Sequence, residues 1–429
     1  MRKFIRIIIL FLMLCAVGLG HGGIYGGHGG IYGGGVSATS ISSAIVSNPD
    51  YAFGNGFRIA ASDAYTWEKN IADYICTGTN DEVEIQAAVD RLTQGGMILL
   101  SSGTFVVSDT IALDSDCTLA GLGQATLLKI PNARNVLLKD VVKATGKDRV
   151  TVRDLQIDGN RANQTATENS GNGVHFYQSS GLIENVYVHS MGVTDDNSSG
   201  IYITGVASTI SGVRVSKCVV WDNLQHGICT TSGANYVTIV DCLARNNLNE
   251  GIHTSTGEYV TIANCISVSN AVSGINLQNA LYATCTNCVI RNNGVSGIYA
   301  SIGRKTITGC YIQASGGYGI NIDSTSGSSY YITISGNTVV GNTYGVRLSQ
   351  VLDCVVSSNT ISTKDTTHDA VRVENLCASG DSGNLCFVGN FLECGGGASK
   401  AINVATAGYI NIVADPNSNC LIGDIYIAE

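Results

Sequence analysis

The chain has 429 residues, of which 44% are hydrophobic and only 13% are charged. This length is sufficient for a large buried core. The 24 Lys and Arg residues stand against 33 Asp and Glu residues, giving a formal net charge of −9. Such a chain offers no basic surface to a nucleic acid, and an acidic polymer would be repelled overall.

Residues 1–20 have the pattern of a secretory signal peptide. Arg2, Lys3 and Arg6 precede the apolar run 7–17, and Gly18 and Gly20 are small residues suited to cleavage. The apolar run is too short to span a bilayer, which needs about 20 residues, and no later segment is apolar enough. We therefore expect a secreted protein, extracellular or at the cell surface, without a transmembrane segment.

Two further segments precede the main body of the chain. Residues 21–64 are expected to be a flexible linker, because they begin with a Gly-rich repeat that contains His21 and His28. Residues 65–128 are expected to form an N-terminal cap with the first strands, at 97–100, 104–107 and 118–122. The cap is expected to contain an amphipathic helix that starts at a capping box formed by Thr79 and Glu82 and ends at Gly95-Gly96. Its apolar face consists of Ile85, Ala88, Val89 and Leu92.

Residues 129–429 contain a repeat in which a small residue is followed by Ile or Val. The steps between successive copies are 22 to 31 residues, and the copies are Gly173-Val174, Gly200-Ile201, Gly227-Ile228, Gly251-Ile252, Gly274-Ile275, Gly297-Ile298, Gly319-Ile320, Gly345-Val346, Ala370-Val371 and Ala401-Ile402. Such a period, rich in β-branched residues, predicts one unit stacked on copies of itself. We expect an all-β parallel β-helix of about ten or more coils, capped by the helix, with residues 421–427 as the closing strand.

Ladders of like residues recur once per coil. One comprises Cys218, Cys242, Cys265, Cys288 and Cys310, followed by Asn337 and Asn359, and a second comprises Asn223, Asn247, Asn270, Asn293 and Asn342. Equivalent side chains on paired coils stack about 4.8 Å apart. We expect the thiols to fill a narrow interior as free cysteines, with disulfides between stacked coils as the alternative.

The cap and coils resemble the pectate-lyase superfamily. The resemblance rests on Glu82–Asp90, Gly95-Gly96, Ser102–Phe105 and Leu119–Gly123, and it extends over residues 65 to 415 through Val152–Asn160 and the Gly-Ile coils. It implies a right-handed β-helix and a long polysaccharide as partner. The superfamily includes pectate lyases, polygalacturonases, epimerases, tailspike depolymerases and members without known activity.

The motifs of two enzyme classes in that superfamily are present only in part. Polygalacturonases carry Gly-His-Gly, but Gln225 precedes His226 here, Asp195-Asp196 lies four residues too early, and Arg-Ile-Lys does not occur. Pectate lyases place calcium-binding acids and a catalytic Arg in the groove. Arg347 and Arg372, on the Gly-Ile strands, are far from the acids.

Three columns of residues, counted from the Gly of each coil, supply the candidate site. Five residues before the Gly stand Glu168, Asp195 and Asp222 on consecutive coils, followed by Asn246, Ser269 and Asn292. Like charges about 4.8 Å apart raise one another's pKa unless a cation lies between them. We predict Asp195 and Asp222 as acid and base, or all three acids as ligands of Ca²⁺. The alternative is structural, since Asp and Asn both suit a turn.

The other two columns flank the Gly-Ile pair. One residue before the Gly, His226 lies beside Glu250, which would keep the imidazole basic. Two residues after it, side chains should point outward, as those of a sugar-binding groove would. This outward column is His175, Tyr202, Cys229, His253, Asn276, Tyr299, Asn321, Arg347 and Arg372. We predict catalysis by Asp195, Asp222, His226 and Glu250, and substrate contacts by Glu168, His175, Tyr202, His253, Tyr299 and Arg347.

Two functions follow. The first is a secreted enzyme, a monomer or a homotrimer, that binds and cleaves an extracellular polysaccharide as a lyase or a hydrolase. The second is a non-catalytic surface or adhesive protein whose β-helix is a rigid spacer. The incomplete motifs favour the second, and the clustering of acids and histidines on the first coils favours the first.

Overall fold

The structure is a computed structural model that describes residues 55–132, 140–164, 171–193, 198–206, 212–324, 329–364, 367–374, 383–393, 401–404, 410–414 and 425–427. The expected signal peptide and most of the expected linker lie outside the described residues, as do Glu168 and Asp195. Within the part that is described, no helix is both long and apolar enough to cross a membrane.

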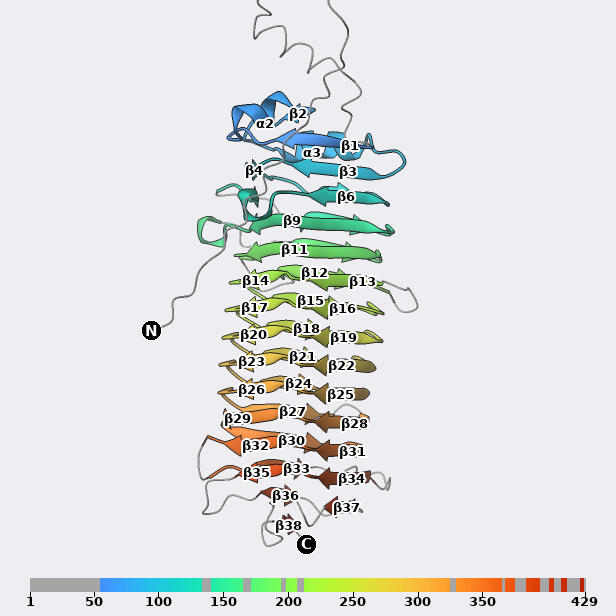
Figure 1. Cartoon of the computed structure of the whole chain (residues 1–429), viewed down its shortest axis with the longest axis vertical. Helices are drawn as coiled ribbons and strands as arrows, with labels where there is room; N and C mark the ends of the chain where they lie inside the picture. The colour runs from blue at the N-terminus through green and yellow to red at the C-terminus, as the bar shows by residue number, and fades with distance from the viewer. Residues whose placement is uncertain are drawn as a thin grey trace, which may run out of the picture. The chain divides into compact units, whose positions relative to one another are not determined.

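The described chain forms a parallel β-helix, which confirms the expected fold. Successive coils stack along one axis and contribute strands to a 13-stranded and a 25-stranded sheet (Figure 1). Each complete central coil contributes three strands, one to the first sheet and two to the second, and all the strand pairs are parallel. One such coil consists of β15 (Ile228–Thr231), β16 (Thr238–Val240) and β17 (Leu243–Arg245).

The 13-stranded sheet carries the Gly-Ile repeat. Besides β15, its strands are β5 (Ile111–Leu113), β8 (Asp140–Thr145), β10 (Asn172–Tyr177), β12 (Ile201–Thr204), β18 (Ile252–Thr254), β21 (Ile275–Leu277), β24 (Ile298–Ala300), β27 (Tyr318–Asp323), β30 (Tyr344–Ser349), β33 (Val371–Glu374), β36 (Ile402–Val404) and β38 (Ile425–Ile427). The last strand, β38, pairs with β36, so the end of the chain does contribute a closing strand.

The 25-stranded sheet contains two series that run side by side, and the long strands β9 and β11 take part in both. Besides β16, the first series is β1 (Gly56–Ala60), β3 (Gly96–Leu100), β6 (Cys117–Ala120), β9 (Val150–Asp158), β11 (Gly181–His189), β13 (Val213–Ser216), β19 (Val260–Ala263), β22 (Tyr282–Thr286), β25 (Arg304–Thr308), β28 (Ser329–Ser335), β31 (Val351–Ser357), β34 (Gly383–Val388) and β37 (Ile410–Ala414). Besides β17, the remaining strands are β2 (Tyr74–Ile75), β4 (Gly103–Val106), β7 (Thr126–Lys129), β14 (Val219–Trp221), β20 (Ile266–Val268), β23 (Val289–Arg291), β26 (Tyr311–Gln313), β29 (Thr338–Asn342), β32 (Thr360–Thr363) and β35 (Phe391–Glu393).

The N-terminal end of the stack carries two short helices, α2 (Thr66–Asn70) and α3 (Glu82–Val89) (Figure 1). The apolar face of α3 is buried, as the sequence predicted, but the capping box is not formed. Its N-cap is Asp81, whose carboxylate accepts hydrogen bonds from the backbone N–H groups of Gly78 and Val106. The strand β1 lies inside the segment expected as linker and pairs with β3, so the cap starts before residue 65. Two 3-10 turns, η2 (Gly123–Ala125) and η3 (Arg161–Asn163), complete the described elements.

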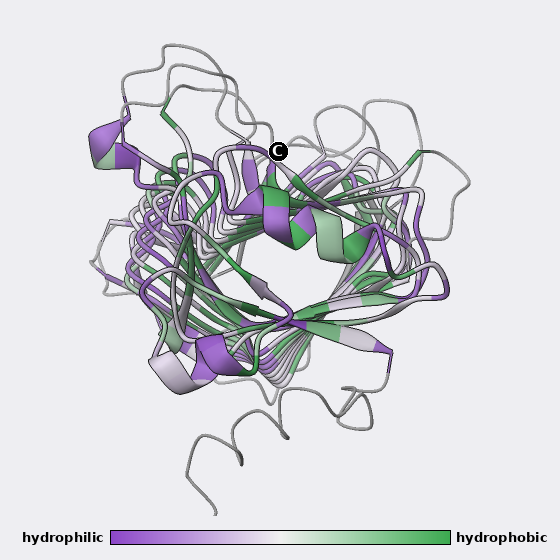
Figure 2. Cartoon of the chain, turned by 90° about the horizontal axis from the view of Figure 1, so that it is seen from above, coloured by the Kyte–Doolittle hydropathy of each residue, from purple (hydrophilic) through white to green (hydrophobic). Residues whose placement is uncertain are grey.

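The strands surround a common interior, and their hydrophobic residues line it (Figure 2). The Gly of each Gly-Ile pair is required by close packing. A Cβ on Gly227 would lie 2.6 Å from the carbonyl oxygen of Gly251 and 2.8 Å from Nδ2 of Asn247. A side chain at Gly227 would clash with the next coil, which explains the small residue at this position of the repeat.

Both predicted ladders lie in the interior. The amide of Asn247 is 1% exposed and donates to Oδ1 of Asn270 at 2.9 Å, while its own Oδ1 accepts from Nδ2 of Asn223 at 3.0 Å. These ladders satisfy buried backbone groups at the corners of the coils. All described cysteines but the half-buried Cys386 are buried, which confirms that the cysteine ladder lies in the interior, and no disulfide joins the described cysteines.

Candidate functional site

The 13-stranded sheet displays the predicted outward column in register. His175 pairs with Tyr202, Tyr202 with Cys229, and Cys229 with His253, and the register continues coil by coil. We call this column the outward ladder; it comprises Lys143, His175, Tyr202, Cys229, His253, Asn276, Tyr299, Asn321, Arg347, Arg372 and Asn403. Nearly every member is a hydrogen-bonding residue, because the strand period of two directs these side chains away from the apolar interior.

Six residues on three coils form what we call the His175 cluster: Asp140, Lys143, Asn172, His175, Tyr202 and Thr204. His175 is 9% exposed, and its ring contacts Asp140 Oδ2 through Nδ1 at 3.0 Å and Thr204 Oγ1 through Nε2 at 2.8 Å. The ring of Tyr202 lies against it, with centroids 4.9 Å apart. Lys143 Nζ is 3.0 Å from Asp140 Oδ2. The imidazole is therefore held in one orientation by its neighbours.

Burial and charge act in opposite directions within this cluster. Burial raises the pKa of Asp140, but the hydrogen bonds from His175 and Asn172 and the charge of Lys143 outweigh it, so the pKa stays below its usual range. Burial, with the nearby Cys229 and Asp140, raises the pKa of Tyr202 to about 12. Asp140 is thus an anion and Tyr202 a neutral phenol at neutral pH.

We call the second group of residues the His226 cluster: His226, Cys229, Glu250, His253 and Asn276. His226 Nδ1 lies 2.7 Å and His253 Nδ1 3.8 Å from Glu250 Oε2, and the two imidazoles stack with centroids 4.4 Å apart. Asn276 Nδ2 donates to Glu250 Oε1 at 3.0 Å. The structure therefore brings together the predicted His226 and Glu250, and adds His253 and Cys229 to them.

The pKa values of this cluster are strongly perturbed. Burial raises the pKa of Glu250, but contact with His226 and His253 outweighs it and lowers the pKa overall. Burial and the neighbouring His226 lower the pKa of His253 to about 4. Burial and the charge of Glu250 raise the pKa of the Cys229 thiol. At neutral pH, His253 is a neutral imidazole.

Farther along the outward ladder, Arg347 is held by two acids. Its guanidinium lies 2.6 Å from Asp323 Oδ2 and 3.0 Å from Glu374 Oε2. Tyr299 lies two coils away on the same ladder and is half-buried. Its pKa is raised by burial and by Asp323. The predicted substrate-binding roles of Tyr299 and Arg347 stay predictions.

The acidic column has the structural features of a turn at the positions described. Asp222, Asn246, Ser269 and Asn292 all adopt left-handed backbone conformations, with φ between 54° and 56°. Asp222 contacts Arg161 at 2.5 Å and Ser190 at 3.3 Å, on the side of the coil formed by β9, β11 and β14. Its expected partner Asp195 lies outside the described residues, as does Glu168, so their roles as acid or as Ca²⁺ ligands stay predictions.

Sequence reasoning missed Asp140, Lys143 and Thr204. Asp140 pairs with Asn172, and Lys143 with His175, so the coil of β8 belongs to the same register. Its Gly position is occupied by Val141, so the Gly-Ile pattern does not mark this coil. Extending the period back by one coil would have revealed Asp140 and Lys143, but not Thr204, which lies at the end of β12.

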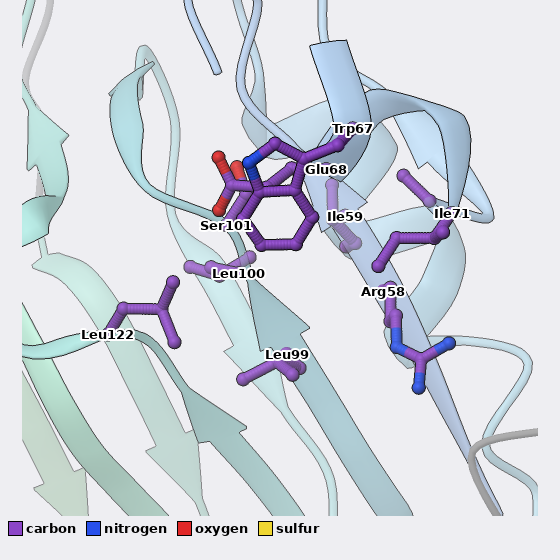
Figure 3. Close-up of a pocket in the computed structure, with 10 residues that line it drawn as sticks. Arg58, Ile59, Trp67, Glu68, Ile71, Leu99, Leu100, Ser101 and Leu122 are labelled. Atoms are coloured by element: carbon purple, nitrogen blue, oxygen red, sulfur yellow. The ribbon is translucent and has the colours of Figure 1, made fainter. Parts of the chain in front are cut away.

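A separate pocket of about 120 Å³ lies in the cap, between α2 and the strands β1 and β3. Figure 3 shows Trp67, Ile71, Leu99 and Leu122 around it. Its one carboxylate, Glu68, accepts hydrogen bonds from Ser102 and from the backbone of Tyr65. The lining is mainly apolar and offers no pair of reactive groups.

Comparison with known proteins bears on the fold. The A-module of a mannuronan C-5 epimerase from Azotobacter vinelandii is 19% identical over 80% of this chain and 97% of that chain, with a TM-score of 0.64. A periplasmic alginate epimerase is 14% identical over 74% of this chain and 75% of that chain, with a TM-score of 0.56. The catalytic domain of an α-1,3-glucanase is 14% identical over 82% of this chain and 66% of that chain, with a TM-score of 0.57. These identities establish a shared fold and no more. No curated protein matches the chain in sequence.

A family model described as "Right handed beta helix region" matches residues 135–301 and 273–414, together more than half of the chain. The match covers the coils that carry the outward ladder and both clusters. The chain belongs to the family of right-handed β-helix proteins.

Proposed function

We propose that the chain binds an extracellular polysaccharide along the outward ladder and transfers protons on a uronic-acid unit at the His175 cluster, as a lyase or an epimerase does. Hydrogen-bonding side chains recur there about every 4.8 Å, which suits a ligand that itself repeats. The similar epimerases and the glucanase are named for action on polysaccharides, which supports this class of partner. The predicted secretory signal would deliver the chain to such a polymer.

The observation that carries the proposal is the orientation of His175. Asp140 would accept the proton of Nδ1, and in the neutral imidazole Nε2 would then carry a lone pair that accepts from the hydroxyl of Thr204. A substrate that displaces this hydroxyl would meet Nε2 of an imidazole that Asp140 holds in one orientation. An Asp-backed imidazole of this kind is a common arrangement for proton transfer.

Two neighbours complete the set of groups that removal of a proton beside a carboxylate requires. Although the net charge of −9 repels an acidic polymer overall, Lys143 places an ammonium group in the site where it could pair with the uronate carboxylate, and this pairing makes the adjacent C–H bond more acidic. Tyr202, with its pKa near 12, remains protonated at neutral pH and can donate a proton. Return of a proton to the opposite face would give epimerisation, and loss of the leaving group would give cleavage by elimination.

The second candidate is the non-catalytic surface protein. Both ring nitrogens of His175 already have partners, and Arg347 is paired with two acids. A rigid spacer would have the same internally satisfied polar face. A hydrolase, with Asp195 and Asp222 as its acids, stays a prediction, since Asp195 is outside the described residues.

The test is a screen of the purified chain against polyuronates and neutral glycans, with calcium or with chelator. Absorbance of unsaturated uronate reports a lyase, NMR of the polymer an epimerase, and reducing ends without unsaturation a hydrolase. The variants His175→Gln and Tyr202→Phe should each lower kcat/KM by about 10²–10⁴-fold. Tyr259→Phe, an exposed tyrosine that stacks between Tyr236 and Tyr282, is the matched control.

The alternatives give different results. Reducing ends that disappear in an Asp195→Asn, Asp222→Asn double variant would support the hydrolase and the acidic column. If protein whose circular dichroism spectrum shows intact β structure gives no product on any glycan, this result would support the non-catalytic spacer.

A further inference from the structure

We propose that His226, Cys229, Glu250 and His253 bind one divalent transition-metal ion of the zinc class. The four residues occupy the same two positions on two adjacent coils. His226-Gly227-Ile228-Cys229 leads into β15, and Glu250-Gly251-Ile252-His253 leads into β18. Parallel pairing in register therefore places the four side chains at the corners of a quadrilateral.

The distances suit a single ion. Ligand atoms of His226, Cys229 and His253 lie within 4.8 Å of one another, and Glu250 Oε2 is 2.7 Å and 3.8 Å from the two Nδ1 atoms. In a tetrahedral zinc site, with metal–ligand distances of about 2.0–2.3 Å, the donor atoms are about 3.3–3.8 Å apart. Small side-chain rotations close this difference, because both imidazoles already project from the same side of the sheet as nearly parallel rings, 18° apart.

Three polar atoms of the cluster have no hydrogen bond of normal geometry within the described part of the protein. Glu250 is 6% exposed, and its Oε2 is buried without a hydrogen bond of normal geometry, as are Nδ1 of His226 and Nδ1 of His253. Buried polar groups almost always have a partner, so three such atoms facing one another indicate a missing ligand. A cation between them would satisfy all three.

The donor set selects the kind of metal. Cys229 contributes the one thiol of the outward ladder, and it is 4% exposed beside His253. Calcium and magnesium prefer oxygen ligands, whereas a set of two imidazoles, one thiolate and one carboxylate suits zinc and its neighbours. Asn276 would act as a positioning residue, since it donates to the other oxygen of Glu250 at 3.0 Å.

The experiment is titration of the metal-stripped chain with Co²⁺, followed by displacement with Zn²⁺. We expect one equivalent to bind, with a thiolate-to-cobalt charge-transfer band in the near ultraviolet and the visible spectrum of a tetrahedral site. Cys229→Ser should abolish the charge-transfer band, and His253→Gln should weaken binding. Asn276→Ala should weaken it by about 10–100-fold, as loss of a partner to a metal ligand does.

The matched control is Cys386→Ser, which removes a half-buried thiol in β34, and it should leave stoichiometry and spectrum unchanged. His253→Gln removes a half-buried side chain and tests the site even if Cys229→Ser fails to fold. Binding without a thiolate band, an unchanged band in folded Cys229→Ser protein, or no bound cobalt would each overturn the proposal. Because metal binding is read without any glycan, failure here leaves the proposed polysaccharide function untouched.

Discussion

Replacement of Lys305 by Ile is expected to stabilise the protein near neutral pH. Lys305 in β25 is 1% exposed, and its neighbours in register are Ala283 and Ile332. Its Nζ contacts the backbone carbonyl oxygens of Ala280 and Ile302, and no carboxylate contact is found among the described residues. Burial therefore lowers the pKa of this amine to about 7.

The size and sign of the effect follow from linkage. The unfolded amine has a pKa of about 10.4, so between pH 7 and pH 10.4 the unfolded state binds more protons, and stability rises with pH. The loss of folding stability caused by burying this amine is about 4 kcal/mol at pH 7 and falls to about 2 kcal/mol at pH 9, because each pKa unit corresponds to 1.36 kcal/mol. Below pH 7 it is nearly constant. Loss of the amine's two hydrogen bonds offsets about 2 kcal/mol of the gain.

The assay is urea unfolding of both proteins at pH 7, 8 and 9, followed by circular dichroism. Lys305→Ile should be more stable by about 2 kcal/mol at pH 7, and this advantage should shrink by about 2 kcal/mol by pH 9. Measuring the difference between the two proteins cancels the other titrating groups. Lys217→Met, on a side chain that is 64% exposed, should show little change at any pH. A difference that stays constant from pH 7 to pH 9 would refute the reasoning, because it would mean that Lys305 keeps an ordinary pKa.

Two further predictions concern the interior ladders. Asn247→Ala removes the oxygen that accepts hydrogen bonds from the backbone N–H and from the side-chain amide of Asn223. This variant should lower the free energy of unfolding in urea by about 3–5 kcal/mol. The control Leu248→Ala, at a side chain that is 51% exposed, should lower it by less than about 0.5 kcal/mol. The buried thiols should react slowly with a disulfide reagent in the native protein and quickly in urea, because burial blocks the access of the reagent. At Cys354, burial also raises the pKa of the thiol. Mass spectrometry that detects disulfides between ladder positions in the native protein would contradict the second prediction.

The register of the outward ladder could be predicted because one small residue per coil sets its phase. Gly200 and Gly227 mark equivalent positions, so Tyr202 must lie beside Cys229 once the coils pair in parallel. The strict alternation of a strand then decides which side chains leave the interior. Lengths of the intervening turns vary, but they do not disturb the pairing, since each coil returns to the same packing site for its Gly.

What escaped prediction depends on positions that do not repeat. The partner of Asp222 is Arg161, which comes from the 3-10 turn η3 after β9, 61 residues away. No period relates such a turn to a coil two steps later. The N-cap of α3 shows the same limit, because Asp81 takes that position through its bonds to Gly78 and Val106, a contact between cap and stack that local sequence does not reveal.

The location of both clusters follows from how a coil uses the residues around its Gly-Ile pair. Gly and Ile are committed to the interior, so the residue before and the residue after the pair are the ones that can change without disturbing the stack. Two adjacent coils then provide four such positions, and these four positions lie next to one another on the sheet. Asp140, Lys143, Asn172 and His175 fill one set, and His226, Cys229, Glu250 and His253 fill another, with Ser199 and Tyr202 on the coil between them. Polar residues at these positions therefore gather in groups on adjacent coils, and one face of the sheet carries both the proposed proton-transfer site and the proposed metal site.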